Sequence, residues 1–293
     1  MLTSPNIGYF PTCDGHQLYW ERHGTPGTEP VFFLHGGPGG RSSRHHLEFF
    51  DLCCFDIILF DQRGGGRSMP QGQLQHNNTG QCVEDIDALR RYFGFQKISL
   101  LGVSWGSWLA IQYQQRYPDA LLKTTLVSVF VPFAQNVRAY DKTLSDALAG
   151  PRARSIYQIL NNGCEAQQRQ AAIGWLKAIL KLNGQSMDPS ALEHFADQEA
   201  VRAIRLELHY HVNHYFFTHT DEGLVVDANT EVIQGTKDRF GMASLRWLRQ
   251  RQSIRCRLLH AGHNAFDRAI VKTVRHSLKR GCGTNKKRLP KVQ

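Results

Sequence analysis

The chain has 293 residues, of which 41% are hydrophobic, which is enough for one large domain or for a domain with an insertion. No apolar run reaches the length of a membrane span and residues 1–10 do not resemble a secretory signal, so we expect a cytoplasmic protein without a membrane contact. The net charge of +10 gathers in the basic C-terminal tail, residues 246–293, which hold 14 Lys or Arg and the single acid Asp267. No aromatic residues interleave with its last basic residues, Lys286, Lys287, Arg288 and Lys291, so nucleic acid is not the expected partner.

Short apolar runs in the first part of the chain predict buried strands that alternate with helices. The expected strands are Gln17–Glu21, Pro30–Leu34, Phe55–Phe60, Ile98–Leu101 and Leu121–Val131. Apolar residues at helical spacing predict helices over Glu84–Phe93 and over residues 105–118. This alternation indicates an α/β fold with a mostly parallel sheet.

The pattern changes after Pro132, where only helical periodicity follows. The expected helices are Ala139–Leu148, Ala153–Leu160, Glu165–Leu182, Pro189–Phe195 and Ala200–Phe217. Strands resume at Thr230–Gln234 and Arg255–His260, and Asp267–Leu278 is expected to be the closing helix. We therefore predict a sheet domain in two parts, residues 1–133 and 228–293, with an α-helical cap of residues 134–227 inserted between them.

A G-x-S-x-G motif, residues 102–106, lies between a predicted strand and a predicted helix. A serine in such a sharp turn adopts a strained backbone conformation that exposes its hydroxyl in front of the helix N-terminus. The flanking glycines are required because a side chain at either position would collide with the neighbouring strand or helix. The context predicts that Ser104 is a nucleophile.

A serine nucleophile needs a base within hydrogen-bond reach and an acid that orients the base. Asp238 and His263 follow two successive predicted strands, on the rim where Ser104 is expected. The order Ser, Asp, His is that of α/β-hydrolases, and it assigns His263 as the base and Asp238 as the orienting acid. Asp227 and Asp267 remain alternative acids.

The glycine cluster of residues 35–40 follows a buried strand and leaves backbone N–H groups free to face an open space. This arrangement suits an oxyanion hole, for which we expect the N–H groups of Gly37 and Trp105. The side chain of Trp105 is also expected to line the pocket. In the next loop, Asp61 and Arg63 are expected to pair and hold the turn.

Four motifs together closely resemble the proline iminopeptidases, or prolyl aminopeptidases. They are H-G-G-P-G-G at 35–40, D-Q-R-G-G-G-R-S at 61–68, G-V-S-W-G-S at 102–107 and Gly262-His263. The resemblance implies an α/β-hydrolase fold with helices on both faces of the sheet, a helical cap, and no metal or cofactor. It also implies a serine peptidase that removes an N-terminal residue, usually proline, from a small peptide or amide.

In that family, carboxylates from the cap hold the free α-amine of the substrate. The family motif E-N-H-Y-F matches residues 207–211, so the resemblance assigns Glu207 to amine binding and puts His211 where a pocket phenylalanine stands. The second carboxylate, in W-x-x-W-E, falls on Ile179, and Phe130 keeps a pocket aromatic. Loss of one charge-assisted hydrogen bond predicts weak recognition of a free amine.

Several alternatives to this assignment stay open. Glu165 is close enough in sequence to replace the missing carboxylate, and Glu207 could instead be a surface residue paired with Arg202 or Arg205. The protein could act on another small amide or ester, or be a non-catalytic binder on the same scaffold. The oligomeric state is open as well.

Histidines and cysteines are numerous but do not form a recognisable metal or disulfide pattern. The histidines of the predicted cap are His209, His211, His214 and His219, and no Cys or Asp completes a ligand set. Seven cysteines, an odd number without regular spacing, favour free thiols. We therefore expect neither a metal nor a disulfide framework.

Overall fold

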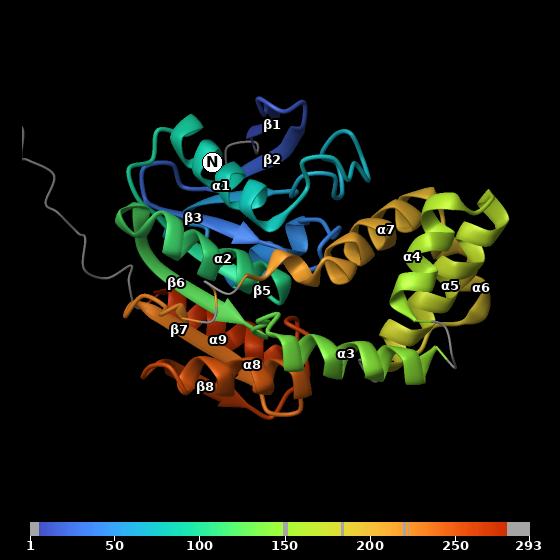
Figure 1. Cartoon of the computed structure of the whole chain (residues 1–293). Coiled ribbons are helices and arrows are strands. Elements are labelled where there is room, and N and C mark those ends of the chain that lie inside the picture. The colour runs from blue at the N-terminus through green and yellow to red at the C-terminus, as the bar shows by residue number, and fades with distance from the viewer. Residues whose placement is uncertain (1–5, 149–151, 183–184, 219–220, 222, 280–293) are drawn as a thin grey trace, which may run out of the picture.

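An eight-stranded sheet lies at the centre of the computed structural model, which describes residues 6–148, 152–182, 185–218, 221 and 223–279 (Figure 1). The strands are β1 (Asn6–Pro11), β2 (Gln17–Gly24), β3 (Glu29–Leu34), β4 (Phe55–Phe60), β5 (Ile98–Val103), β6 (Leu121–Val127), β7 (Thr230–Gly235) and β8 (Arg255–Leu259). Their spatial order is β1-β2-β4-β3-β5-β6-β7-β8. Strand β2 pairs antiparallel with both β1 and β4, and all pairs from β3·β4 to β7·β8 are parallel.

The helices cover both faces of this sheet. The α-helices of the described residues are α1 (Thr79–Tyr92), α2 (Trp105–Arg116), α3 (Ala134–Ala147), α4 (Ala153–Asn162), α5 (Glu165–Leu182), α6 (Pro189–Phe195), α7 (Gln198–Val212), α8 (Arg239–Arg249) and α9 (Arg268–Lys279). Short 3₁₀ turns are η1 (Arg44–Phe49), η2 (Pro118–Ala120) and η3 (His214–Phe216). Helices α1, α2 and α8 pack on one face, and α9 with η1 packs on the other.

The strands are apolar on both sides because both faces of the sheet are covered. In β3, Phe32 belongs to the core beneath α1 and α2, whereas Phe33 belongs to the core beneath α9. Leu100 and Leu101 of β5 divide in the same way. This alternation within continuous apolar runs is typical of a parallel sheet and confirms the predicted fold class.

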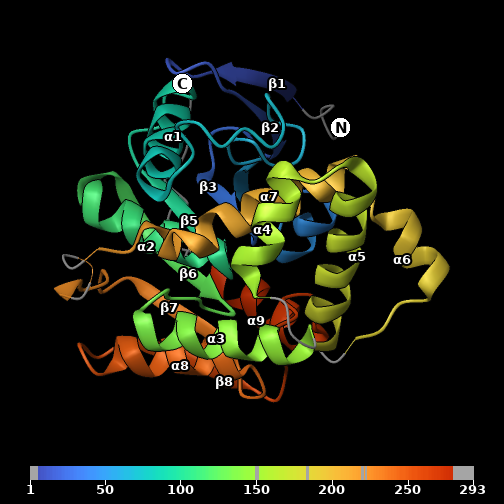
Figure 2. The ribbon, with the colours of Figure 1, turned by 45° about the vertical axis from the view of Figure 1, so that its right-hand side comes forward.

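Five helices, α3 to α7, lie between β6 and β7 in the chain. Figure 2 shows α4 and α5 between α3 and α7. Their apolar faces form a separate core that includes Leu144, Ile156, Trp175 and Leu208. The boundaries at residues 133 and 227 stay a prediction, and most of the basic C-terminal tail, from residue 280 onward, lies outside the described residues.

Strand β6 ends at Val127, four residues earlier than predicted. Ser128 has a φ of 47°, which turns the chain out of the ladder. The next backbone N–H groups then donate to side chains: Val129 to Gln234 Oε1 at 2.8 Å, and Phe130 to Ser107 Oγ at 2.9 Å. Side-chain acceptors thus replace the strand partner, and the turn directs Phe130 toward the carboxyl edge of the sheet.

The predicted helix Ala200–Phe217 also ends early, with α7 stopping at Val212. Residues 214–216 follow with φ values of 51°, 54° and 55°, all in the left-handed region that L-residues rarely occupy. Tyr215, the middle residue, is buried, and its carbonyl accepts a hydrogen bond from Thr79 Oγ1 at 2.6 Å. This left-handed turn brings Tyr215 back beneath α7.

Candidate active site

Ser104 lies in a sharp turn between β5 and α2. Its φ of 52° and ψ of −120° are strained for a residue with a side chain, at a cost of about 1–3 kcal/mol. A Cβ on Gly102 would lie 2.4 Å from the Gly106 carbonyl oxygen, and one on Gly106 would lie 2.0 Å from the Leu34 carbonyl oxygen. Both glycines are therefore required for the turn that presents the Ser104 hydroxyl.

Three predicted residues meet at the carboxyl edge of the sheet. Ser104 Oγ lies 3.0 Å from Nε2 of His263, and Nδ1 of His263 lies 2.7 Å from Oδ2 of Asp238. An ionised carboxylate can only accept, so Nδ1 carries the proton and Nε2 is free to accept from the Ser104 hydroxyl. This is the order of donors and acceptors that a serine nucleophile requires.

Asp238 is held as an anion by its surroundings. Burial by itself raises the pKa of this carboxyl, but the hydrogen bond and charge of His263, with hydrogen bonds from Gly241 and Gln234, outweigh burial and hold the pKa below its usual value. The Gly241 N–H donates to Oδ1 at 2.9 Å, and Gln234 Nε2 donates to Oδ2 at 2.8 Å. Both carboxylate oxygens are therefore fixed in position.

The two alternative acids lie elsewhere. Asp227 Oδ1 accepts from the N–H of Asn229 at 2.7 Å, and Asp267 Oδ1 accepts from the N–H of Ala269 at 2.9 Å. Each caps its own local turn, and neither is bonded to His263. Asp238 is thus the acid that the fold brings to the histidine.

The glycine-rich loop after β3 lies directly against Ser104. A Cβ on Gly36 would lie 3.4 Å from Cβ of Ser104, and Gly37 has a φ of 129°, a region that favours glycine. Gly37 lines the same cavity as Ser104, and Trp105 begins α2 directly after Ser104. The two expected oxyanion-hole residues therefore flank the serine.

The side chain of Gln62, for which the sequence predicted no role, links these two segments. Its Oε1 accepts from Trp105 Nε1 at 3.0 Å, and its Nε2 donates to the carbonyl of His35 at 2.9 Å. The Trp105 indole is consequently buried and not among the residues lining the cavity, which corrects the expectation for it. A buried amide directly after a strand, in the D-Q-R motif, is the signal that could have identified Gln62.

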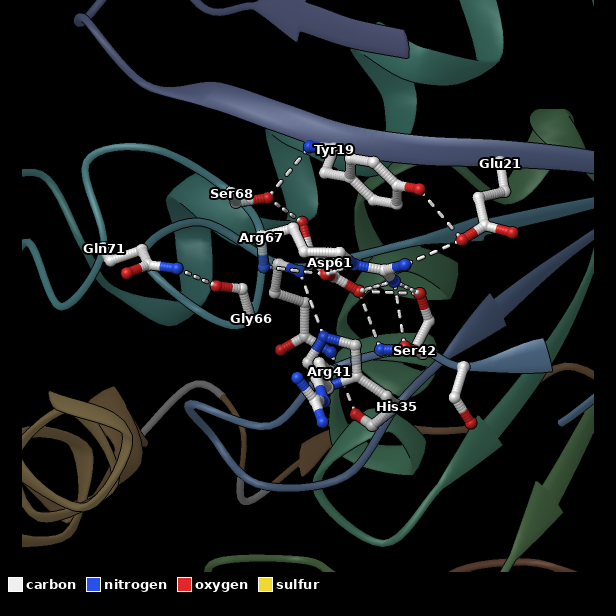
Figure 3. Close-up of polar contacts among 12 residues, drawn as sticks. Tyr19, Glu21, His35, Arg41, Ser42, Asp61, Gly66, Arg67, Ser68 and Gln71 are labelled. Atoms are coloured by element: carbon white, nitrogen blue, oxygen red, sulfur yellow. Dashed lines mark hydrogen bonds and ion pairs between the residues drawn. The ribbon is translucent and has the colours of Figure 1, made fainter. Parts of the chain in front are cut away.

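An ionic cluster around the buried Asp61 lies beside the same loop (Figure 3). Asp61 accepts from the backbone N–H and hydroxyl of Ser42 at 2.7 and 2.6 Å, and from Arg67 Nε at 2.7 Å. The expected pair of Asp61 with Arg63 is wrong, because Arg63 turns away and binds Asp85 at 2.6 Å. Ser42 follows the glycines, so the cluster holds the loop against Ser104.

Replacing Gln62 with methionine is expected to lower kcat by about 10- to 100-fold while changing KM little, because it removes the link between the segments that carry the two oxyanion donors. Trp105→Phe removes the same hydrogen bond from the other side. The measurement is kcat and KM for both single variants and the double variant. The double variant should lose less than the product of the single losses, since both break one contact. A fully multiplicative loss would contradict this role of Gln62.

A cavity of about 670 Å³ opens in front of Ser104. Its lining includes Phe130 from the turn after β6, Ile179 from α5 and Glu207 from α7. Glu207 Oε2 accepts from Trp175 Nε1 at 3.2 Å, and burial raises the pKa of its carboxyl to about 7 despite that bond. Three of the four residues expected to bind substrate therefore face one cavity.

The alternatives for Glu207 and Ile179 are not supported by the contacts. Glu207 forms no ion pair with Arg202 or Arg205 and lines the cavity instead. Glu165 stands at the first turn of α5, about 20 Å along the helix from Ile179, and accepts from Gln198 Nε2 at 2.9 Å. Glu165 does not line the cavity and therefore does not replace the missing carboxylate. The cavity wall at Ile179 is apolar.

His211, the fourth expected residue, lies behind the wall of the cavity. Its Nε2 lies 3.3 Å from Asp141 Oδ1, its Nδ1 lies 3.4 Å from the Tyr215 hydroxyl, and burial lowers its pKa. Tyr215 lines the cavity in its place, because the left-handed turn after α7 brings it there. No pattern in the local sequence predicts that turn.

Six further residues line the cavity that the sequence did not predict there. They are Tyr140, Thr143, Leu182, Lys237, Arg239 and Phe240.

Within the described ranges, no three His, Cys, Asp or Glu side chains gather as a metal ligand set, and His219 falls outside those ranges. Among the same residues, none of the helices is both long and apolar enough to cross a membrane.

Comparison with known proteins agrees with this geometry. The family model of the alpha/beta hydrolase fold matches residues 29–269. A probable proline iminopeptidase of Leptolyngbya boryana is 30% identical over 290 residues, which cover 90% of this chain and 90% of that protein. A proline iminopeptidase of Arabidopsis thaliana is 31% identical over 259 residues, covering 79% and 67%.

Solved structures show the same fold. A proline iminopeptidase-related protein of Thermus thermophilus superposes with a TM-score of 0.67 at 23% identity, covering 94% of this chain and 98% of that one. The alpha/beta hydrolase family model spans most of the chain, and the two relatives match it at 30% identity or slightly above. The chain therefore belongs to the proline iminopeptidase family of α/β-hydrolases.

Proposed function

We propose that this hydrolase uses Ser104 to remove the N-terminal residue, with proline favoured, from a small peptide or amide. The observation that carries the proposal is the unbroken hydrogen-bond chain from Ser104 through His263 to Asp238, at a cavity that Glu207 of α7 lines from the opposite wall. A binder has no need of a serine in a strained turn aligned with a histidine base.

In the first half-reaction, Ser104 Oγ attacks the carbonyl carbon and its proton passes to Nε2 of His263. The imidazolium is stabilised by Asp238, and the oxyanion is held by the N–H groups of Gly37 and Trp105, each worth roughly 3–4 kcal/mol in the transition state. The C–N bond then breaks as His263 returns the proton to the leaving amine. Water, deprotonated by the same histidine, releases the acid from Ser104.

Glu207 gives the cavity its preference for a cationic group at the acyl end. Its carboxyl is neutral below a pKa of about 7 and anionic above it. A substrate α-amine carries its proton up to about pH 8. Attraction between the two is therefore greatest between about pH 7 and 8, and with Ile179 in place of a second carboxylate it rests on Glu207 alone.

The test compares prolyl-naphthylamide with its N-acetylated analogue, as the ratio of kcat/KM values between pH 6 and 8. We expect the ratio to rise with pH in the wild type, and Glu207→Gln to lower it about tenfold or more at pH 8 and to abolish its pH dependence. Glu199→Gln, an exposed glutamate on the same helix that pairs with Arg41, is the matched control and should leave the ratio unchanged.

A parallel screen with short-chain p-nitrophenyl esters tests the alternative that the protein is an esterase. Hydrolysis of the esters with no hydrolysis of any aminoacyl-naphthylamide would overturn the peptidase assignment and leave an esterase with the same nucleophile. A ratio that does not respond to Glu207→Gln would remove Glu207 from amine recognition.

A further inference from the structure

Four charged side chains line the active-site cavity, and they come from two different walls. Glu207 belongs to α7, whereas Lys237, Asp238 and Arg239 follow β7. Asp238 is fully engaged with His263 and its other donors. Lys237 and Arg239 are exposed, and neither forms an ion pair with an acidic side chain within the ranges that the structure describes. Two cations without an anion thus stand at the rim of the cavity.

The cations are separated from Glu207 by aromatic side chains. The guanidinium of Arg239 lies 5.9 Å from the ring centre of Phe240, and that ring lies 5.1 Å from the ring of Tyr140. Both rings line the cavity. Burial raises the pKa of the Tyr140 hydroxyl, and the charge of Glu207 raises it further, which puts that carboxylate near Tyr140. The cavity is therefore negative at one end and positive at the other.

The direction of the reaction decides which end of a substrate meets the cations. His263 returns its proton to the leaving amine, so the leaving segment lies on the side of His263 and Asp238. Lys237 and Arg239 flank Asp238 in the chain. The acyl residue, with its α-amine, lies toward Glu207 on the opposite wall.

We infer that Lys237 and Arg239 form a subsite for the free carboxylate of the leaving segment, and that the preferred substrates are dipeptides and tripeptides. Lys237 and Arg239 line the same cavity as Ser104, and one residue adds at most about 3.6 Å to an extended chain, so a short leaving segment of one or two residues keeps its terminal carboxylate in that cavity. The inference rests on the proposed function, because the order of acyl and leaving ends comes from it.

The kinetic test compares prolyl-glycine with prolyl-glycinamide, which differ only in the terminal carboxylate. We expect kcat/KM to favour prolyl-glycine about threefold to tenfold at low salt, since exposed ion pairs are individually weak. The preference should shrink in 1 M NaCl, where charges are screened beyond about 3 Å. The double variant Lys237→Gln/Arg239→Gln should bring the ratio close to one.

The matched control is Arg246→Gln/Arg249→Gln, which removes the same two charges from exposed positions on α8 outside the cavity. We expect this variant to keep the preference for prolyl-glycine. An equal fall in both double variants would assign the effect to net charge and overturn the subsite. No preference in the wild type would overturn it as well.

A binding measurement separates this inference from the proposed function. Calorimetry on Ser104→Ala, with intact prolyl-glycine and prolyl-glycinamide, reads the subsite without turnover. Tighter binding of prolyl-glycine than of prolyl-glycinamide, lost when Lys237→Gln and Arg239→Gln are added, supports the subsite. This holds even if the wild type does not hydrolyse prolyl-naphthylamide, because missing hydrolysis would refute only the proposed function. Equal binding of both ligands, or no binding of either, overturns the subsite while leaving naphthylamide hydrolysis to stand.

Discussion

Replacing Ser104 with alanine is expected to lower kcat by roughly 10⁴- to 10⁶-fold, because the nucleophile is lost while only an oxyanion hole and a binding cavity remain. The fold should be unaffected. Alanine tolerates the φ of 52° no worse than serine does, and the Ser104 backbone keeps its bonds to Val127 and Ser107, at 3.0 and 2.8 Å. The measurements are kcat on the best substrate of the screen and thermal unfolding of the same sample.

A fluorophosphonate probe gives a second reading of this prediction. It should label the wild type at Ser104 and leave Ser104→Ala unlabelled. Ser190→Ala is the control and should be labelled like the wild type, because Ser190 is an exposed serine of α6 whose hydroxyl is bonded to Asp188. Turnover by Ser104→Ala within tenfold of the wild type would mean that another residue is the nucleophile. Absence of labelling in the wild type would favour a non-catalytic binder.

Asp238→Asn is expected to lower kcat by about 10³- to 10⁴-fold and to cost about 1–3 kcal/mol of stability, because a buried donor loses its acceptor. Oδ2 of Asp238 receives both His263 and Gln234, and Oδ1 receives the Gly241 N–H. Whichever way the asparagine amide turns, its NH₂ group faces a donor. With NH₂ toward His263, Nδ1 must accept and Nε2 carries the proton, so the base is blocked.

The controls are Asp227→Asn and Asp267→Asn, which alter carboxylates that cap local turns away from His263. Both should keep kcat within a fewfold of the wild type. The pH profile of kcat for each variant distinguishes a lost base from a loss of folded protein. If either control proved more damaging than Asp238→Asn, the acid of the site would be misassigned.

Part of the site follows from local sequence. The turn at Ser104 needs glycines at positions 102 and 106, because the strand and helix leave no room for a Cβ. Asp238 and His263 each come just after a strand, and parallel strands bring their carboxyl ends to one edge of the sheet. Strand, turn and glycine signals of this kind act over a few residues, so the sequence by itself determined the fold class and these three positions.

Contacts between distant segments could not be derived in this way. Asp61 was expected to pair with Arg63, two residues away, but Asp85 and Asp14 draw Arg63 aside, and Arg67 takes its place. The bridge made by Gln62 joins His35 and Trp105, which lie 27 residues before and 43 residues after it in the chain, and it exists only once both segments are packed. Ion pairs and buried amides depend on which partners the fold brings within reach.

The substrate end of the cavity was decided by the tertiary structure alone. The helical period predicted a helix through Phe217, and the resemblance to the family motif put His211 in the pocket. Instead, α7 ends at Val212, and a left-handed turn presents Tyr215 to the cavity. The turn is unfavourable locally and persists because Tyr215 is buried and its carbonyl binds Thr79. Short-range geometry was enough to predict Ser104, His263 and Asp238 as candidate nucleophile, base and acid, and the fold brings their side chains within hydrogen-bond distance. Only the packing of α3, α5 and α7 over the sheet establishes which side chains line the cavity, because those contacts join segments that are distant in the chain.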